Sequence, residues 1–324
     1  MDNRRKLFLL IILIFINIFL LHKYITSSLR KTNQSDVDLP SAENIVAKKN
    51  SIYFHETSSR GQLTVRQACC IESCARTNRK FQTNVIFSSR FESDFGINKL
   101  LSQIGNIKFF TVDIANYVKG TPIENFDTSI LQKSKWPMHV TSDALRFLTL
   151  YKLGGIYLDL DVMVIRPLEF LGRNWAAIED AIQVGSSAIA FATDTVGRYV
   201  AEQAIINFVD EFNLTDYVNN GPGVITRVLN ELCETDLPEP GSCLGFKIYP
   251  RGTFSPIPYH RAAKYFQAFV ISELKSRNIF GYHMFNYVSK NIRIEEHSFY
   301  ANLAKEYCPT IYNEFSHEFS YHKL

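Results

Sequence analysis

Residues 141–168, TSDALRFLTLYKLGGIYLDLDVMVIRPL, constrain the fold more than any other stretch of the chain. Thr141 or Ser142 can cap a helix that carries several leucines, and Gly154-Gly155 can end this helix with a positive φ. The apolar run Ile156–Leu158 follows the glycines directly and has the character of a buried strand. The sequence therefore predicts a helix that returns at once into a strand.

Asp159 and Asp161 stand at the end of this predicted strand, and Val162–Ile165 is apolar again. Two carboxylates in such a place repel each other and lose hydration, which costs stability unless a cation lies nearby. Oxygen ligands favour Mg²⁺ or Mn²⁺ over zinc, and these ions commonly join protein carboxylates to substrate phosphates. A solvated turn is the alternative interpretation of an Asp-x-Asp triplet, but the apolar flanks favour a metal site.

Asp143 and Arg146 lie three residues apart and so on one face of the predicted helix. A surface ion pair, worth about 0.3–0.5 kcal/mol, is one interpretation. Contact with a ligand in the crevice beside the strand is the other, and the spacing alone leaves both open.

Three segments rich in β-forming residues precede this block: Ile52–Glu56, Asn84–Ser88 and Ile107–Thr111. The stretches between them are long enough for helices, as in Thr64–Asn78. A β-α-β-α-β order predicts parallel strands, because these need crossover connections, and a ligand crevice at their carboxyl ends. The expected fold class is α/β.

Charge and composition argue against a nucleic-acid-binding protein. The chain of 324 residues has a formal net charge of +3, but residues 51–324 hold 27 basic and 28 acidic residues. A nucleic-acid-binding protein needs a concentrated basic face, so we expect no nucleic acid among the partners. At 46% hydrophobic and 21% charged residues, the chain has the composition of a folded protein.

The N-terminus has the pattern of a membrane anchor. Three basic residues, Arg4, Arg5 and Lys6, precede the apolar run Leu7–Leu21. Continued through Ile25, the run forms a helix of about 28 Å, near the roughly 30 Å of a hydrocarbon core. A cleaved signal peptide is the alternative, but no small-x-small site precedes the polar stretch that follows. The basic cluster should keep the N-terminus cytosolic and the rest of the chain lumenal.

Residues 26–50 lack hydrophobic periodicity and are expected to form a solvated stem. The predicted organisation is a cytosolic tail at 1–6, a signal anchor at 7–25, the stem at 26–50 and a lumenal globular part at 51–324. Sequons at Asn33 and Asn213 agree with a glycosylated, lumenal protein.

The six cysteines fit an oxidising compartment. Cys233 and Cys243 flank the loop ETDLPEPGS, and a disulfide there is favoured over two free thiols. The other four, Cys69, Cys70, Cys74 and Cys308, cannot be paired from sequence. A zinc site is disfavoured for them, because Cys70 and Cys74 lie on a predicted helix without an accompanying pair.

Six ordered segments resemble the α1,4-glycosyltransferases, a family that includes globotriaosylceramide synthase and α1,4-N-acetylglucosaminyltransferases. The segments are IYFHETSSR, CCIESCARTN, SDALRFLTLYKLGGIYLDLD, GPGVITRVLNELC, YHMFN and YCPT. The similarity spans about residues 51–310 and is far more specific than an Asp-x-Asp triplet. It implies a type II Golgi membrane enzyme with a Rossmann-like, GT-A type fold, which transfers a sugar from a UDP donor with retention of configuration.

The resemblance also implies roles for individual residues. Asp159 and Asp161 would hold Mn²⁺, or Mg²⁺, on the UDP diphosphate, with His283 as a further metal ligand. Asp143 and Arg146 would face the ribose and the transferred sugar. The remaining implied contacts of the UDP-sugar are Gly221, Pro222 and Asn286. No nucleophile is evident, so attack from the face that UDP leaves is the working hypothesis.

Departures from the family pattern are few. Phe285 replaces the tryptophan of the late His-x-Trp-Asn motif, which keeps an aromatic wall and removes the indole donor. Leu160 replaces a commoner threonine, and Gly223 stands where a larger residue is usual. None of these removes an implied ligand. Without the motif, His283 would be interpreted as a buried histidine satisfied by hydrogen bonds.

The expected activity is transfer of galactose or N-acetylgalactosamine to a terminal sugar of a glycosphingolipid in α1,4 linkage. One alternative is a UDP-GlcNAc α1,4-transferase that acts on glycoproteins. Another is a catalytically silent lumenal binding or chaperone protein of the same fold. Complexes with other transferases are a further expectation.

The type II topology is testable on sealed microsomes. Residues 51–324 should resist protease until detergent opens the vesicles, because the basic cluster holds the N-terminus in the cytosol. Digestion of that region without detergent would contradict the topology. A mature N-terminus near residue 26 would establish cleavage of a signal peptide instead.

Overall fold

The computed structural model describes residues 17–19, 21, 39–47, 50–92, 96–268, 274 and 278–319. The chain divides into two compact units, residues 1–37 and 38–324. The predicted tail 1–6, most of the predicted anchor 7–25 and the Asn33 sequon lie outside the described residues. Within the described ranges, the structure has no helix of the length and hydropathy that a membrane span requires.

Strands and helices alternate through the first half of the larger unit. The strands are β1 (Ser51–Glu56), β2 (Gln82–Phe87), β3 (Ile107–Thr111), β4 (Gly155–Leu158), β5 (Val162–Val164), β6 (Trp175–Ile178), β7 (Val184–Phe191), β8 (Gly241–Cys243), β9 (Phe246–Tyr249) and β10 (Gly281–His283). The α-helices are α2 (Val65–Thr77), α3 (Gly96–Ser102), α4 (Ile114–Tyr117), α5 (Pro137–Leu153), α6 (Thr195–Asp210), α7 (Val224–Cys233), α8 (Asn286–Ser289), α9 (Phe299–Tyr307) and α10 (Pro309–Glu314). Shorter helical turns include η1 (Ala42–Asn44), η2 (Thr128–Lys133), η3 (Leu168–Leu171), the π-helical turn η4 (Asn219–Gly223), η5 (Arg251–Thr253), η6 (Tyr259–Phe266) and η8 (Ser316–Glu318).

The main sheet has the strand order β3-β2-β1-β4-β7-β6-β9-β8. Strands β1 to β4 are parallel, as the β-α-β-α-β pattern predicts. Strand β7 pairs antiparallel with both β4 and β6, so the sheet as a whole is mixed. Strands β5 and β10 form a separate antiparallel pair. The predicted α/β class is confirmed as a mixed α/β fold with a central sheet.

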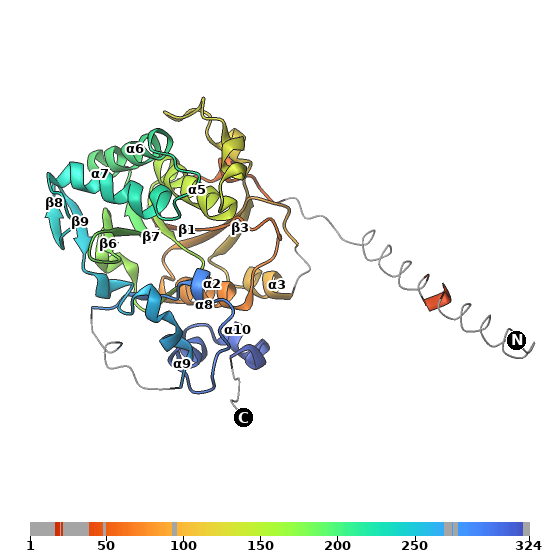
Figure 1. Ribbon diagram of the computed structural model, residues 1–324. Helices are drawn as coiled ribbons and strands as arrows, with labels where there is room; N and C mark the ends of the chain where they lie inside the picture. The colour runs from red at the N-terminus through yellow and green to blue at the C-terminus, as the bar shows by residue number, and fades with distance from the viewer. Residues whose placement is uncertain are drawn as a thin grey trace, which may run out of the picture. The chain divides into compact units, whose positions relative to one another are not determined.

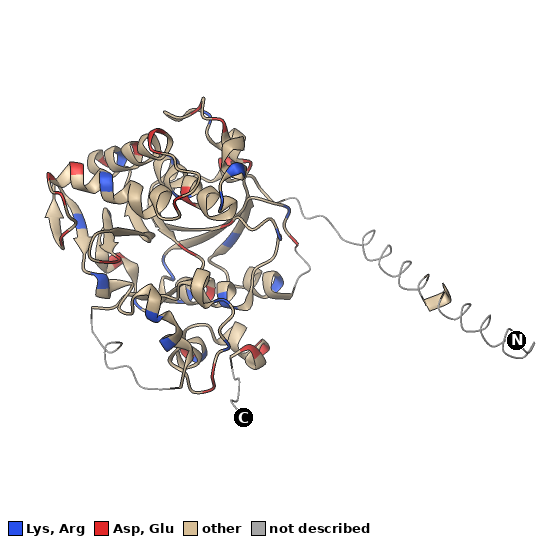
Figure 2. Cartoon of the chain, in the orientation of Figure 1, with Lys and Arg blue, Asp and Glu red and all other residues tan. Residues whose placement is uncertain are grey.

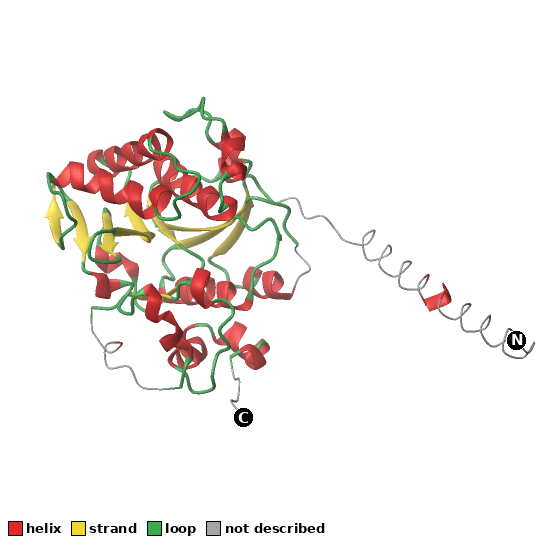
Figure 3. Ribbon diagram, viewed as in Figure 1, coloured by secondary structure: helices red, strands yellow, loops and turns green. Residues whose placement is uncertain are grey.

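Two hydrophobic cores cover the two faces of the sheet, because successive strand residues point to opposite faces. Ile52 and Phe54 of β1 pack in the core that includes α2, α9 and α10. Tyr53, between them, packs in the core that includes α5, α6 and α7. Figures 1 and 3 show the two helix layers with the strands between them. Basic and acidic positions are interspersed over both layers (Figure 2).

The chain changes direction across the sheet between β1 and β4. The crossovers through α2 and α3 lead from β1 to β2 and β3 on one side, and α5 then carries the chain to β4 on the other side. At such a switch point, the loops after the two strands diverge and leave a crevice at their carboxyl ends. Glu56 ends β1 and Asp159 follows β4 at this edge.

Helix α5 begins earlier than the sequence predicts. Pro137 lies in its first turn, for which proline is preorganised, and the expected caps Thr141 and Ser142 lie inside the helix. The predicted end is confirmed, since Gly154 and Gly155 have φ of 62° and 103°. A Cβ on Gly155 would lie 2.6 Å from the Ser51 carbonyl oxygen. The glycine therefore lets β4 start directly against β1.

The folded unit includes part of the segment that the sequence assigned to the stem. The Thr111 N–H donates to the Pro40 carbonyl at 3.1 Å, and Ser41 bridges to Thr111 beside β3. Ala42 is buried and joins a core. The folded unit thus begins before residue 51, because the sheet edge, rather than any local periodicity, orders these residues. The Asn213 sequon is exposed.

The predicted Cys233–Cys243 disulfide is confirmed. A second disulfide joins Cys69 of α2 to Cys308, the residue ahead of α10, across 239 residues of sequence. Cys70 and Cys74 are free and buried. The second disulfide ties the C-terminal helices to the first crossover helix of the sheet.

The long-range disulfide should contribute more stability than the local one. In the chain-entropy model, closing 239 residues is worth about 5 kcal/mol and closing 10 is worth about 2.5–3 kcal/mol. The double variant Cys69→Ala/Cys308→Ala should therefore lower the unfolding free energy more than Cys233→Ala/Cys243→Ala, as measured by urea denaturation. Equal losses, or the reverse order, would contradict this ranking.

Candidate functional site

Asp159 and Asp161 flank the turn between β4 and β5, at the switch point of the sheet. The Asp159 N–H donates to the Ser187 carbonyl of β7 at 2.8 Å, which extends the β4 pairing up to the site. The Tyr157 hydroxyl donates to Asp159 Oδ1 at 2.6 Å. The Asn286 N–H donates to Asp161 Oδ2 at 2.6 Å. Both carboxylates are therefore oriented by the protein before any ligand binds.

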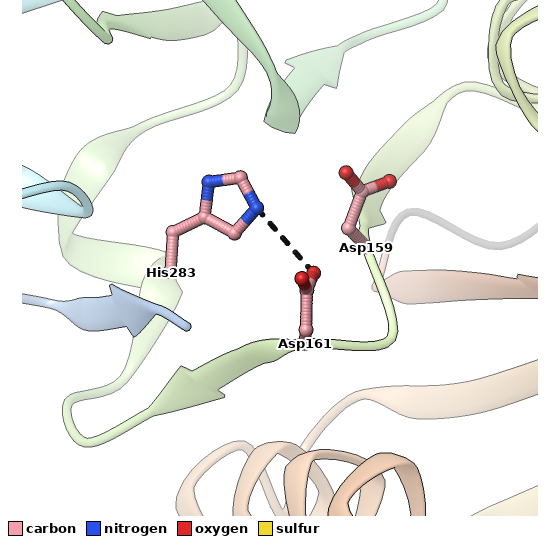
Figure 4. A group of neighbouring side chains, drawn as sticks. All are labelled: Asp159, Asp161 and His283. Carbon is pink, nitrogen blue, oxygen red and sulfur yellow. Dashed lines mark ion pairs between the residues drawn. The ribbon is translucent and has the colours of Figure 1, made fainter. Parts of the chain in front are cut away.

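His283 reaches these carboxylates through the small β5–β10 sheet. Its register partner is Val162, the residue after Asp161, so pairing of β10 with β5 brings the imidazole to the turn. His283 Nε2 lies 3.4 Å from Asp161 Oδ1, and Figure 4 shows the three side chains around one space. The structure thus places His283 beside the Asp-x-Asp pair.

The three side chains fit a divalent cation. One ligand atom from each residue can be chosen so that all lie within 4.8 Å of one another. Two donors on one Mg²⁺ or Mn²⁺ lie up to about 4.2 Å apart, so small side-chain rotations complete the geometry. The two carboxylates are ligands that suit Mg²⁺ or Mn²⁺, and the imidazole adds a nitrogen donor.

Burial and mutual attraction determine the pKa values of Asp161 and His283. Burial raises the pKa of the Asp161 carboxyl, but the charge of His283 and hydrogen bonds outweigh it and hold this pKa below its usual value. Burial lowers the pKa of His283, yet Asp161 and Glu179 outweigh it and hold that pKa well above the usual value. In the metal-free protein, a proton on His283 thus supplies part of the positive charge that the carboxylates require.

Glu179 is a site residue that sequence reasoning missed. It follows β6, and its Oε2 lies 3.7 Å from His283 Nδ1, an atom that is buried and has no hydrogen-bond partner within the described residues. A Cβ on Gly185 would lie 2.8 Å from the same carboxylate oxygen, so the glycine leaves room for it. Glu179 has no motif around it, and only the pairing of β6 with β7 places it here.

Asp143 and Arg146 form a buried ion pair inside the site. Arg146 Nη2 lies 2.9 Å from Asp143 Oδ1 and 3.2 Å from Asp159 Oδ1, so one nitrogen bridges both carboxylates. Its Nη1 donates to the Ser186 carbonyl at 2.9 Å and to the Ser186 hydroxyl at 2.6 Å. The guanidinium carbon lies 4.7 Å from the centre of the Tyr157 ring. Of the two interpretations left open by the spacing, the surface pair is wrong.

Burial changes the protonation of Asp143 more than that of Arg146. Burial raises the pKa of Asp143 to about 6, and the attraction of Arg146 opposes that rise. Burial favours the neutral form of Arg146, but Asp159, Tyr157 and Asp143 together outweigh it and raise its pKa. Arg146 therefore stays charged at every physiological pH, whereas Asp143 titrates near neutrality.

The other predicted contacts border the same space. Gly221, in η4, packs so close to Asp143 that a Cβ there would lie 2.4 Å from Asp143 Oδ1. Pro222 follows it in the same turn, and its carbonyl accepts the Thr226 hydroxyl at 2.7 Å. Asn286 contacts Asp161 through its backbone rather than its side chain. Phe285 packs on His283 with 4.0 Å between ring centres, so the predicted aromatic wall is present.

A surface hollow lies at the opposite edge of the sheet from Asp159 and Asp161. It is lined by backbone and side chains at the start of β4 and the end of β7, among them Gly155, Phe191 and Thr193. The titratable groups described above all lie at the carboxyl edge of β1 and β4.

Two family models match consecutive parts of the chain. Residues 64–181 match the glycosyltransferase sugar-binding region containing the DXD motif. Residues 193–315 match the alpha 1,4-glycosyltransferase conserved region. The first match contains Asp159 and Asp161, and the second contains His283.

Relatives align over most of the chain. Human lactosylceramide 4-alpha-galactosyltransferase is 29% identical over 274 residues, which are 80% of this chain and 76% of the relative. The gorilla protein of the same name is also 29% identical, over 80% of this chain and 82% of the relative. Human alpha-1,4-N-acetylglucosaminyltransferase is 26% identical over 84% of this chain and 82% of the relative.

Similar solved structures include the PaToxG glycosyltransferase, at 16% identity and a TM-score of 0.42 over 65% of this chain and 80% of that one. The glycosyltransferase GlyE of Streptococcus pneumoniae has 15% identity and a TM-score of 0.43 over 84% of this chain and 65% of that one.

The two matched regions together include Asp143, Arg146, Asp159, Asp161 and His283. The alignments with relatives extend over about four-fifths of the sequence. The chain is a glycosyltransferase that contains a DXD sugar-binding region and the conserved region of the alpha 1,4-glycosyltransferases.

Proposed function

We propose that this glycosyltransferase has a GT-A type fold, depends on a divalent metal and moves galactose or N-acetylgalactosamine from a UDP-sugar to a terminal sugar of a glycosphingolipid. The new linkage is α1,4, formed with retention of configuration. One observation carries the proposal: Asp159, Asp161 and His283 meet at the switch point beside the buried Asp143–Arg146 pair. A metal-bound diphosphate and the sugar attached to it would occupy these two adjacent places.

Asp159, Asp161 and His283 would hold Mn²⁺ or Mg²⁺. When bound, the ion stabilises the negative charge that collects on the diphosphate as the sugar–phosphate bond breaks. Tyr157 and the Asn286 N–H hold the two carboxylates in place, so little reorganisation accompanies binding.

Arg146 would act on the sugar side of the donor. Its guanidinium is fixed by Ser186 and by the Tyr157 ring, so its charge has one position in the site. Asp143 accepts from Arg146 and keeps a second oxygen for a hydroxyl of the sugar or ribose. Gly221 and Pro222 would cover the donor from the side of η4, and Asn286 from the side of α8.

In the transfer itself, the acceptor hydroxyl oxygen bonds to the anomeric carbon while the sugar–phosphate bond breaks. The electron pair leaves with UDP, and the hydroxyl proton passes to the diphosphate. We infer attack from the face that UDP leaves.

We also propose a Golgi membrane protein of type II topology, which works beside other transferases. The basic cluster and apolar run at residues 4–25 support this placement, and so do the disulfides.

A second candidate is transfer of N-acetylglucosamine to glycoproteins, which the 26% identity to the human alpha-1,4-N-acetylglucosaminyltransferase favours. Incubation with UDP-Gal, UDP-GalNAc and UDP-GlcNAc in turn, with lactosylceramide and with N-acetylgalactosamine-terminated glycans, separates the candidates. A silent binding protein of the same fold would neither transfer nor hydrolyse any of the three donors.

Asp161→Ala should abolish activity, because it removes one of the carboxylates that would hold the metal. It also removes the partner of the buried His283 side chain, so circular dichroism should first establish that the variant is folded. Loss of one electrostatic stabiliser costs about 10²–10³ in rate, and loss of the metal should cost more. EDTA should mimic the variant, and added Mn²⁺ should rescue the wild type alone. Calorimetric titration should show Mn²⁺ binding weakened in Asp161→Ala and unchanged in the exposed control Asp236→Ala.

Full activity of Asp161→Ala in EDTA would refute the metal assignment. Equal Mn²⁺ affinity of the two variants would place the metal elsewhere. His283→Ala should give a milder loss than Asp161→Ala, because imidazole is the third ligand.

Asp143 should make stability depend on pH. Its folded pKa of about 6 is above the unfolded value of 3.8, so its stabilising contribution is complete below about pH 4 and is lost as pH rises through 6. The unfolding free energy of metal-free residues 38–324, relative to Asp143→Asn, should thus fall by about 2 kcal/mol between pH 4 and 7. Urea denaturation at both pH values measures it, and a difference that stays constant with pH would contradict the burial argument.

A further inference from the structure

Four aromatic rings gather beside the site from three segments that are distant in sequence. Trp136 and His139 stand at the start of α5, Tyr217 precedes η4, and Tyr287 lies in α8. The centre of the Tyr217 ring is 5.3 Å from Trp136, 5.1 Å from His139 and 4.7 Å from Tyr287. His139 also lies 5.6 Å from Tyr287. These four rings, here called the aromatic cluster, form one continuous surface around Tyr217.

Helix α5 and the turn η4 bring the cluster to the donor site. His139 lies one helical turn ahead of Asp143 on α5. Tyr217 lies four residues ahead of Gly221, which packs directly against Asp143. The cluster therefore borders the place proposed for the transferred sugar.

Helix α8 completes this arrangement from the metal side. Tyr287 follows Asn286, whose N–H binds Asp161. Burial and then the charges of Asp143, Asp159 and Asp161 raise the pKa of Tyr217, in keeping with a ring close to all three carboxylates.

The cluster is incompletely covered. Tyr287 is 51% exposed, and the adjacent Met138, Val218 and Val288 are 39%, 37% and 46% exposed. Within the part of the chain that the structure describes, the hydroxyls of Tyr217 and Tyr287 have no hydrogen-bond partner. Apolar ring faces with free hydroxyls at their edge suit a pyranose, which offers C–H faces and hydroxyls together.

We propose that the aromatic cluster is the acceptor subsite and binds the terminal pyranose of the acceptor glycan, with Tyr217 and Tyr287 as its main contacts. This inference rests on the proposed function, because an acceptor hydroxyl must reach the sugar held at Asp143 and Arg146. Lys135 lies 5.0 Å over the Trp136 ring, but the Tyr217 and Tyr287 rings that form the main contacts have no positive charge to pair with a diphosphate, so the donor is not the occupant. An acyl chain would leave both tyrosine hydroxyls unused.

Sugar binding can be followed separately from transfer. The chain has two tryptophans: Trp136 is in the cluster, and Trp175 is fully buried in the core against Phe254. Titration of the full-length protein in detergent, with UDP and Mn²⁺ present, should use lactose, methyl β-galactoside and methyl N-acetyl-β-galactosaminide as probes. At least one probe should change the tryptophan emission with saturation. In Trp136→Phe the change should vanish, while saturation-transfer NMR still detects the bound sugar.

Tyr287→Ala should raise the Kd of that sugar about five- to tenfold, which corresponds to roughly 1–1.4 kcal/mol for the lost ring contact. Tyr287→Phe, which keeps the ring, should raise the Kd by about two- to fivefold. The matched control is Tyr199→Ala, because Tyr199 is a tyrosine on α6 that is 41% exposed. The Kd of this variant for the sugar should equal that of the wild type.

Three results would overturn the inference. They are no sugar binding by the wild type, an unchanged Kd in Tyr287→Ala, and a rise in acceptor KM for lactosylceramide without any rise for lactose. The last result would assign the cluster to the lipid. Loss of sugar affinity in Tyr287→Ala would support the subsite whether or not any UDP-sugar serves as a donor. If the protein transferred none of the three sugars, that result would refute the proposed function and leave the subsite standing.

Discussion

The positive charge of Arg146 is the condition on which the rest of the site depends. Asp143 and Asp159 converge on one of its nitrogens, and both would be costly to bury as free anions. Arg146 is itself buried, so it needs those carboxylates as much as they need it. Ser186 and Ser142 accept its other hydrogen bonds, and the Tyr157 ring packs on its flat face. The outcome is a rigid charged group at the carboxyl edge of the sheet.

The second half of the chain supplies the cationic partner of Asp161, which lies in the first half. Asp161 has no partner of opposite charge on β4 or β5, and its cationic neighbour His283 arrives from β10, late in the sequence. The Cys69–Cys308 disulfide and the packing of α9 and α10 against α2 hold that C-terminal part on the sheet. The proposed metal ligands therefore depend on contacts well outside the site, which would link folding of the whole unit 38–324 to metal binding.

The site divides into places with different chemistry. Carboxylates and imidazole at the β4–β5 turn suit a cation, the Asp143–Arg146 pair suits a polar sugar, and the aromatic cluster offers ring faces. Helix α5 supplies residues to the last two, because His139 and Asp143 are one turn apart on it. A single helix thus sets the distance between the proposed donor sugar and the proposed acceptor.

Local pattern was enough to predict the core of the fold and the Asp-x-Asp site. Residues 141–168 encode a helix, its glycine end, a buried strand and two carboxylates within one continuous stretch, so each prediction needed only neighbours in sequence. The Cys233–Cys243 disulfide was predictable for the same reason, as its loop is short. The place of His283 needed the family motif, since a lone histidine has no local signature.

Tertiary structure alone decided the rest. Glu179 reaches His283 through the pairing of β6 with β7, the aromatic cluster joins three separate segments, and residues 39–47 are ordered by the edge of β3. The Asp143–Arg146 spacing was equally compatible with solvent or burial, and packing of α5 on the sheet settled it. Sequence determines what lies within a helix turn or a strand, because those contacts are set by local geometry. Contacts between distant segments depend on how the sheet and its two layers assemble, and no local pattern records that.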